Sequence, residues 1–117
     1  MNYTILAYET QDAYAARTDP GRQQAYVAGW MAYSQVLREA GIMVTGAGLQ
    51  APETATTIKL RDGQPQVQDG PYADSKEQLG GFYIINVPDL DTALSWAARS
   101  PAAVAGGVVE VRPNIPM

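Results

Sequence analysis

The strongest constraint on the fold comes from residues 82–87, with the sequence FYIINV, because they predict a strand that is apolar on both faces. Alternate side chains of a strand point to opposite sides, so Phe82 and Ile84 share one face and Tyr83 lies on the other. Helices of the same chain can cover one face, whereas a small domain that exposed the other would associate. We therefore expect a sheet that carries helices on one side and packs against a second copy of the chain on the other. A monomer that leaves this face exposed is the alternative.

Two helical patterns are available to cover the first face. The longer one spans residues 20–40, with Asp19 as the expected N-cap, Pro20 at the first helical position and Gly41 as the C-cap. A second helix is expected after Asp89. The apolar stripe of the longer helix recurs at spacings of four, three and four residues, and it comprises Tyr26, Trp30, Tyr33 and Leu37.

The remaining elements give the order β-α-β-hairpin-β-α-β within one domain that spans residues 1–117. The Asp62-Gly63 pair is typical of a tight hairpin turn, and Gly46 and Gly48 indicate a bulge or a close backbone approach. This order predicts an α+β, ferredoxin-like fold with an inserted hairpin. Strands are expected at residues 3–8, 42–49, 54–60, 66–68, 80–87 and 108–112, with a helical turn at 13–17.

Composition excludes several classes of chemistry. The chain has neither histidine nor cysteine, so it contains no Ser/His/Asp triad, no imidazole base and no thiol nucleophile. With 12 acidic and 8 basic residues its net charge is −4, which disfavours binding to nucleic acid. We find no signal peptide and no apolar run of membrane-spanning length, and we expect a cytoplasmic protein that does not bind membranes.

Residues 69–83, DGPYADSKEQLGGFY, resemble the signature of the YCII-related proteins, in particular the DGPF group. The likeness covers nearly the whole chain and extends to GLQ at 48–50, TATT at 54–57, PDLD at 88–91, AL at 93–94 and VEVRP at 109–113. The resemblance implies a dimeric α+β barrel built from ferredoxin-like protomers. It also implies an unassigned biochemical role, in a group whose genes often lie beside genes for extracytoplasmic-function sigma factors.

Two departures from the family pattern limit what the resemblance implies. Tyr72 stands where the DGPF signature has phenylalanine, which adds a hydroxyl group that must face water or find a partner. The wider family includes enzymes built around a His-Asp dyad, and this chain has no histidine with which to form one. The chemistry of that dyad therefore does not transfer.

Lys76 and Glu77 are the first candidate site residues, because they lie where a loop meets a strand. In the functional interpretation Lys76 binds an anionic group and Glu77 acts as a base. In the structural interpretation Glu77 accepts hydrogen bonds from loop amides while Lys76 is solvated. Asp69 is a second candidate acid or base, and the alternative for the Asp69-Gly70-Pro71 segment is a self-sufficient Asx turn.

Arg112 is the best anion anchor that the sequence offers, since a guanidinium presents five donors in a fixed fork. The alternative is a structural salt bridge. Tyr8 and Glu9, at the end of the first strand, are placed to reach the same cavity, and Tyr83 is a candidate for stabilising charge. Trp30, Tyr26 and Tyr33 are explained by helical spacing as core residues.

Three functions are compatible with these residues. The first is a homodimer that binds a small, anionic molecule in a barrel pocket near Lys76, Glu77 and Arg112. The second is a cofactor-free lyase or isomerase, with Glu77 or Asp69 as proton carrier and charge stabilised by side chains such as Arg112. The third is a protein-interaction module without a ligand. The scattered carboxylates predict no metal site, and no cofactor is expected.

Overall fold

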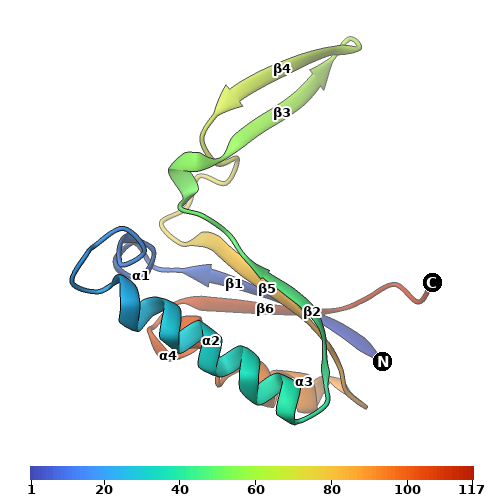
Figure 1. Ribbon diagram of the computed structural model, residues 1–117. Coiled ribbons are helices and arrows are strands. Elements are labelled where there is room, and N and C mark those ends of the chain that lie inside the picture. The colour runs from blue at the N-terminus through green and yellow to red at the C-terminus, as the bar shows by residue number, and fades with distance from the viewer.

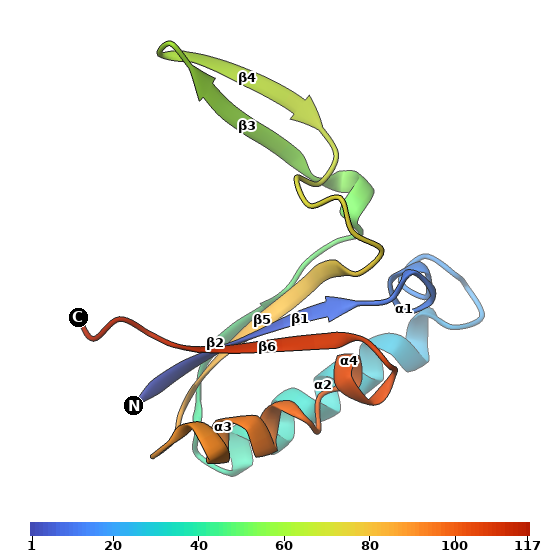
Figure 2. The same ribbon diagram turned by 180° about the vertical axis from the view of Figure 1, so that it is seen from behind.

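The computed structural model describes residues 1–117 and contains a four-stranded antiparallel sheet with its helices on one face (Figures 1 and 2). In spatial order the strands are β2 (Met43–Gly48), β5 (Gln78–Asn86), β1 (Asn2–Glu9) and β6 (Val108–Pro113). The helices are α1 (Gln11–Ala15), α2 (Gln23–Glu39), α3 (Leu90–Ala97) and α4 (Pro101–Val104). This arrangement is ferredoxin-like, and the predicted α+β fold is confirmed.

An inserted hairpin interrupts the body between β2 and β5. It follows the 3-10 turn η1 (Pro52–Thr54) and consists of β3 (Thr56–Arg61) and β4 (Gln64–Asp69), which pair only with each other. Asp62 and Gly63 both have positive φ, at 51° and 77°, as a tight I′ turn requires. The hairpin predicted from Asp62-Gly63 is therefore confirmed, and it stands away from the sheet as an arm (Figure 1).

Helix α2 ends where the sequence predicts and begins later than predicted. Gly41, with φ of 73°, terminates it through hydrogen bonds from its own N–H to Arg38 and from the Ile42 N–H to Leu37, which form a Schellman motif. The expected start at Asp19-Pro20 is wrong, because the Asp19 carboxylate accepts a hydrogen bond from the Gly21 N–H at 2.9 Å and forms a turn instead. Helix α4, which Ser100 caps, was not expected from the sequence.

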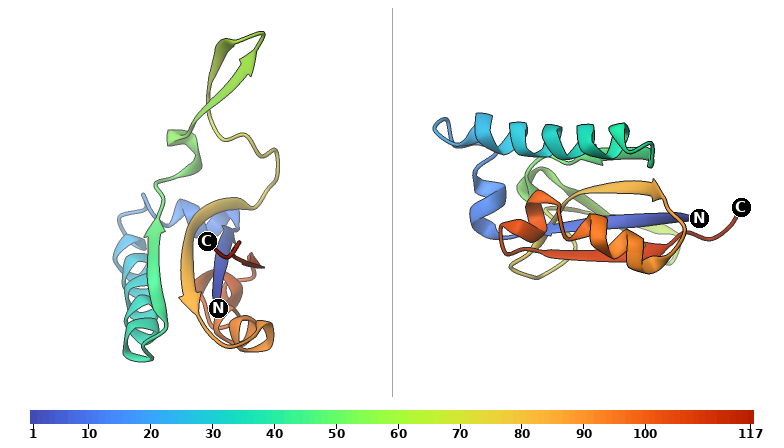
Figure 3. Two further views of the ribbon diagram at one scale, coloured as in Figure 1. Left: turned by 90° about the vertical axis from the view of Figure 1, so that its right-hand side faces the viewer. Right: turned by 90° about the horizontal axis from the view of Figure 1, so that it is seen from below.

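The core lies between the helices and one face of the sheet (Figure 3). In β1 the residues with odd numbers are buried, from Tyr3 to Glu9, and those with even numbers are partly exposed. Tyr83 and Ile85 of β5 are buried on the same side. The core comprises Tyr3, Ile5, Tyr33, Leu37, Tyr83, Ile85, Val87, Ala93 and Ala97.

The opposite side of the sheet has no covering element, and we call it the open sheet face. Cross-strand pairing places Leu6 opposite Phe82 and Glu110, and Thr4 opposite Ile84 and Arg112, so these side chains share one face. Strand β5 thus carries apolar side chains on both faces, as predicted. On β1, β5 and β6 the open sheet face consists of Thr4, Leu6, Tyr8, Phe82, Ile84, Val108, Glu110 and Arg112.

The loop that joins the hairpin to β5 is held by Gln78, which is buried and whose side-chain amide donates to the carbonyl groups of Ala73 and Ser75 at 2.9 Å. The Asx turn expected at Asp69 does not form, because Asp69 ends β4 with its carboxylate free of hydrogen bonds within the chain. Gly70 supplies the bend with φ of 99°. None of the helices is long and apolar enough to cross a membrane.

Candidate functional site

A buried ion pair lies where β1 meets the turn after α1. The Glu9 side chain is 1% exposed and contacts the Arg17 guanidinium, which is 11% exposed. The same guanidinium donates to the Gly80 carbonyl at 2.8 Å and to the Leu49 carbonyl. Arg17 therefore ties the ends of β1, β2 and β5 together, and Gly80 must lack a side chain because a Cβ there would overlap the Glu9 carboxylate.

Tyr26 of α2 completes this cluster. Its hydroxyl lies 2.8 and 2.7 Å from the two Glu9 carboxylate oxygens, to which it donates its single proton, and it accepts from Arg17 Nε at 2.8 Å. Burial and the Glu9 carboxylate together raise the pKa of Tyr26 well above its ordinary value. The phenol thus stays protonated and holds Glu9 and Arg17 in place.

Four of the five guanidinium N–H groups of Arg17 are used in these contacts. Each of these four N–H groups has a different partner, namely Glu9, Tyr26, Gly80 and Leu49. One N–H on Nη1 remains, on a side chain that lines the neighbouring cavity. Arg17 therefore lines the cavity with one N–H group that has no partner in the chain, and Glu9 balances its charge.

Aromatic rings form the inner wall beside this cluster. Trp30 stacks on Tyr83 with ring centroids 5.9 Å apart and an interplanar angle of 21°, and Tyr33 meets both rings edge-on. The Tyr83 hydroxyl pairs with the Ser34 hydroxyl, which also donates to the Trp30 carbonyl at 3.0 Å. Burial raises the pKa of Tyr33 to about 12. These contacts fix the orientation of Trp30 and Tyr83.

A cavity of about 680 Å³ lies between α2 and the ends of β2 and β5, a volume in the range of small-molecule sites. Gly48 of β2 leaves part of this volume open, because a Cβ there would meet no atom within 4 Å. Trp30 and Tyr26 line it from the helix, so these two residues are not solely core residues as their spacing suggested. Further apolar lining comes from Val27, Met31, Ala47, Leu49 and Tyr83.

The charged side chains that line this cavity are both arginines, Arg17 and Arg38, although acids outnumber bases in the chain by 12 to 8. Arg38, in the last turn of α2, forms no ion pair. The cavity therefore combines aromatic walls with one unpaired positive charge, which suits an anion that carries an apolar body. No group of three or more acidic side chains is arranged to hold a metal ion.

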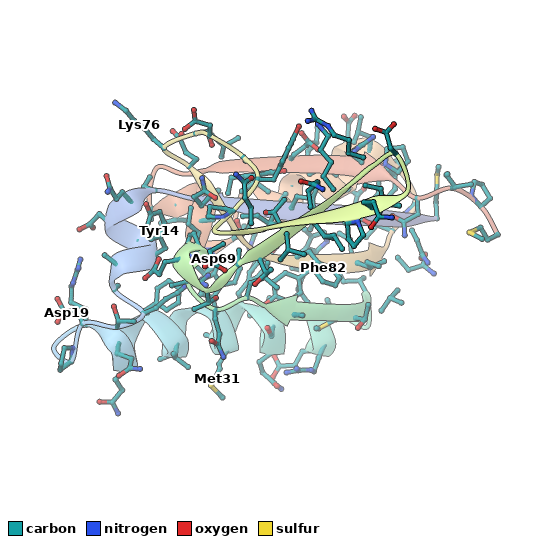
Figure 4. All side chains as sticks on the ribbon, turned by 90° about the horizontal axis from the view of Figure 1, so that it is seen from above. Tyr14, Asp19, Met31, Asp69, Lys76 and Phe82 are labelled. Atoms are coloured by element: carbon teal, nitrogen blue, oxygen red, sulfur yellow. The ribbon has the colours of Figure 1, made fainter.

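The sequence-predicted site residues are divided between three places. Tyr83 lines the cavity. Lys76 and Asp69 are exposed and Glu77 is half-buried, on the loop and at the base of the arm. Figure 4 shows Lys76 at the outer rim of the molecule, on the side away from Met31. The structure thus separates Lys76 and Asp69 from the cavity that Tyr83 lines.

Arg112 and Tyr8 lie on the open sheet face, on the side of the sheet that faces away from α2. Arg112 is 72% exposed and its guanidinium lies 4.0 Å from the Glu110 carboxylate. A pair that is so exposed contributes little to stability. The structure therefore leaves Arg112 free for a partner that would cover this face.

The cluster around Arg17 was not identified from the sequence as a site, although one signal pointed to it. Every second side chain of a strand lies on the same face, so Glu9 shares the buried face of β1 with Tyr3 and Ile5. Alternation alone therefore places a carboxylate on the buried face. A buried carboxylate requires a partner. Its partner Arg17 follows α1 in an irregular turn, where no periodicity indicates direction.

Taken together, the topology and the cavity define an α+β protein of ferredoxin-like fold with a site of small-molecule size between α2 and the sheet. The chain belongs to the YCII-related family, whose domain model matches residues 1–117. An uncharacterised protein of Rhizobium meliloti (strain 1021) is 34% identical over 114 residues, which span 97% of this chain and 91% of that relative.

A solved structure shares the fold. It is the 5-chloro-2-hydroxyhydroquinone dehydrochlorinase TftG from Burkholderia phenoliruptrix AC1100, in complex with 2,5-dihydroxybenzoquinone. The match has a TM-score of 0.57 and 18% sequence identity, and it covers 98% of this chain and 94% of TftG. The match shows that this chain and TftG share the α+β fold that the sequence predicts.

Proposed function

We propose that this protein binds a small anionic molecule with a flat, apolar body in the cavity between α2 and the sheet. The observation that carries this proposal is that two arginines and no carboxylate line a cavity walled by Trp30 and Tyr83. Arg38 supplies the unpaired charge, while the remaining N–H of Arg17 supplies a directed donor. Because Glu9 balances the charge of Arg17, the anion should lie nearer Arg38.

The complex of TftG with 2,5-dihydroxybenzoquinone supports the choice of ligand class, since that molecule is flat, and its ring hydroxyls are acidic. It also supports a second candidate function, a cofactor-free lyase or isomerase. For such an enzyme Glu77 and Asp69 remain the proposed proton carriers. Turnover that survives both Glu77→Gln and Asp69→Asn would refute that assignment.

We propose further that the protein is a homodimer that packs through the open sheet face. The partly exposed apolar residues Leu6, Phe82 and Ile84 support this, because they form the middle of an uncovered sheet. Arg112 and Tyr8, which lie on this face, would then approach the partner copy. The cytoplasmic location and the link to sigma-factor circuits stay predictions of the sequence.

Titration with 2,5-dihydroxybenzoquinone, followed through tryptophan fluorescence, tests the cavity. We expect Arg38→Gln to weaken binding by about 10- to 100-fold, the effect of losing a charged hydrogen bond, without changing thermal stability. Lys76→Gln removes the same charge from the loop and is the matched control. Binding that is weakened by Lys76→Gln and unaffected by Arg38→Gln would place the ligand at the loop and refute the cavity proposal.

A further inference from the structure

The inserted arm is an amphipathic hairpin whose apolar side has no cover. Ile58 pairs with Val67 and Leu60 with Pro65, so these four side chains share one face, which we call the apolar arm face. Ile58, Leu60 and Val67 are each between 64% and 68% exposed. The other face carries only polar side chains, namely Thr57, Lys59, Arg61, Gln64, Gln66 and Gln68.

A two-stranded hairpin with an uncovered apolar face is marginally stable by itself. Apolar and polar side chains alternate along both strands of the arm, which is the pattern of a strand that is buried on one face. A hairpin that served only as a linker would not need this pattern. The sequence of the arm therefore fits a strand pair that is covered on one side. Within the chain that cover is missing, since the body leaves β3 and β4 exposed along their length.

The accessible surface of the whole chain is also larger than that expected for a compact monomer of this mass. Its accessible area is 7784 Å², whereas a compact monomer of 12.5 kDa exposes about 6,200 Å². The excess of about 1,600 Å² is twice the roughly 800 Å² that each partner contributes to a standard interface. The radius of gyration, 15.6 Å, likewise exceeds the value of about 13 Å expected for this length. The arm and the open sheet face thus leave enough surface for a stable dimer.

The arm and the open sheet face lie on the same side of the molecule. Figures 1 and 2 show the arm rising on the side of the sheet that is opposite the helices, so a body seated on the open sheet face would lie beside it. The open sheet face carries both Glu110 and Arg112, and a two-fold axis can therefore pair unlike charges across it. A second copy fits both surfaces at once.

We propose that the β3–β4 arm clasps a second copy of this chain by laying the apolar arm face on it, with each copy's arm holding the other. This inference rests on the proposed sheet-to-sheet dimer and adds a second contact to it. Because the interface is isologous, the two arm contacts are equivalent and each dimer gains both.

Sedimentation of the full chain over a range of concentrations tests the clasp. The double variant Ile58→Lys/Val67→Lys changes one cross-strand pair on the apolar arm face, and Thr57→Lys/Gln68→Lys adds the same charge to the adjacent pair on the polar face. We expect the first variant to raise the dimer dissociation constant by at least about 100-fold, since burying two such side chains contributes this much, and the control to change it less than about threefold.

A second measurement exploits the absence of cysteine. A spin label on Leu60→Cys, on the apolar arm face, should lose mobility when the protein dimerises, while a label on Arg61→Cys should stay mobile. A wild-type dimer with equal dissociation constants for both double variants, or a mobile label at position 60, overturns the clasp and leaves the sheet-to-sheet dimer standing. A wild-type chain that sediments as a monomer at every concentration overturns both.

Discussion

Replacing Gly80 by alanine should separate the buried ion pair and strongly destabilise the protein. The added Cβ would overlap the Glu9 carboxylate and lie 2.6 Å from Arg17 Nη2, and the Glu9 side chain, which is 1% exposed, cannot move aside into solvent. Breaking a buried pair costs about 3 to 5 kcal/mol, a large part of the about 5 to 15 kcal/mol that stabilises a typical domain. With about 2.1 cal/mol/K of unfolding entropy per residue, the melting temperature should fall by about 12 to 20 °C.

Thermal unfolding followed by circular dichroism measures this change, and urea unfolding supplies the free energy independently. Gly48→Ala is the matched control, since it makes the same substitution in a neighbouring strand where a Cβ meets no atom within 4 Å. The control should shift the melting temperature by no more than about 4 °C. If Gly80→Ala melts within the same small interval of the wild type, the Glu9 and Arg17 contact does not stabilise the fold and our account of the cluster is wrong.

Two further predictions concern the helices. The raised pKa of Tyr33, about 12, means that the folded state keeps this proton when unfolded chains, which titrate near ~10, have lost it. This contribution to stability is complete below a pH of about 10 and is lost as the pH rises toward 12, so urea midpoints should fall more steeply over that interval in the wild type than in Tyr33→Phe. Gly41→Ala should lower the unfolding free energy by about 1 kcal/mol in urea titrations, because φ there is 73°, and an unchanged midpoint would contradict the Schellman assignment.

The sequence predicted those parts of the fold that depend on local rules. The first strand, the Gly41 helix end and the Asp62-Gly63 turn each follow from conformational preferences of a few neighbouring residues. The start of α2 was wrong because two rules competed at Asp19. Its carboxylate can cap a helix or close a turn, and the hydrogen bond from Gly21 together with the ion pair to Arg22 favoured the turn.

The site was harder to predict because its parts come together only through tertiary contacts. Arg17 and Glu9 are eight residues apart, but Arg17 is also held by the carbonyl groups of Leu49, just after β2, and of Gly80 in β5. Lys76 and Glu77 are charged side chains at a junction of loop and strand, which a sequence reveals, whereas the cavity lies beside glycines, which carry no side-chain chemistry. A sequence shows which residues are charged, but it does not show where the folded chain leaves a cavity.

The glycines connect the fold of this protein to its cavity. Gly46 admits the Tyr83 ring, since a Cβ there would lie 2.7 Å from it, and Gly81 lets β5 approach the Ala47 carbonyl, which a Cβ would meet at 2.8 Å. These close approaches hold β2 and β5 together as a sheet. Gly48 of β2 lines the cavity together with Trp30 and Arg38, and a Cβ there would meet no atom within 4 Å. The glycines of β2 and β5 therefore have two different effects: Gly46 and Gly81 allow close packing of the sheet, whereas Gly48 leaves volume open in the cavity, so a larger side chain at position 48 should be tested for both stability and binding.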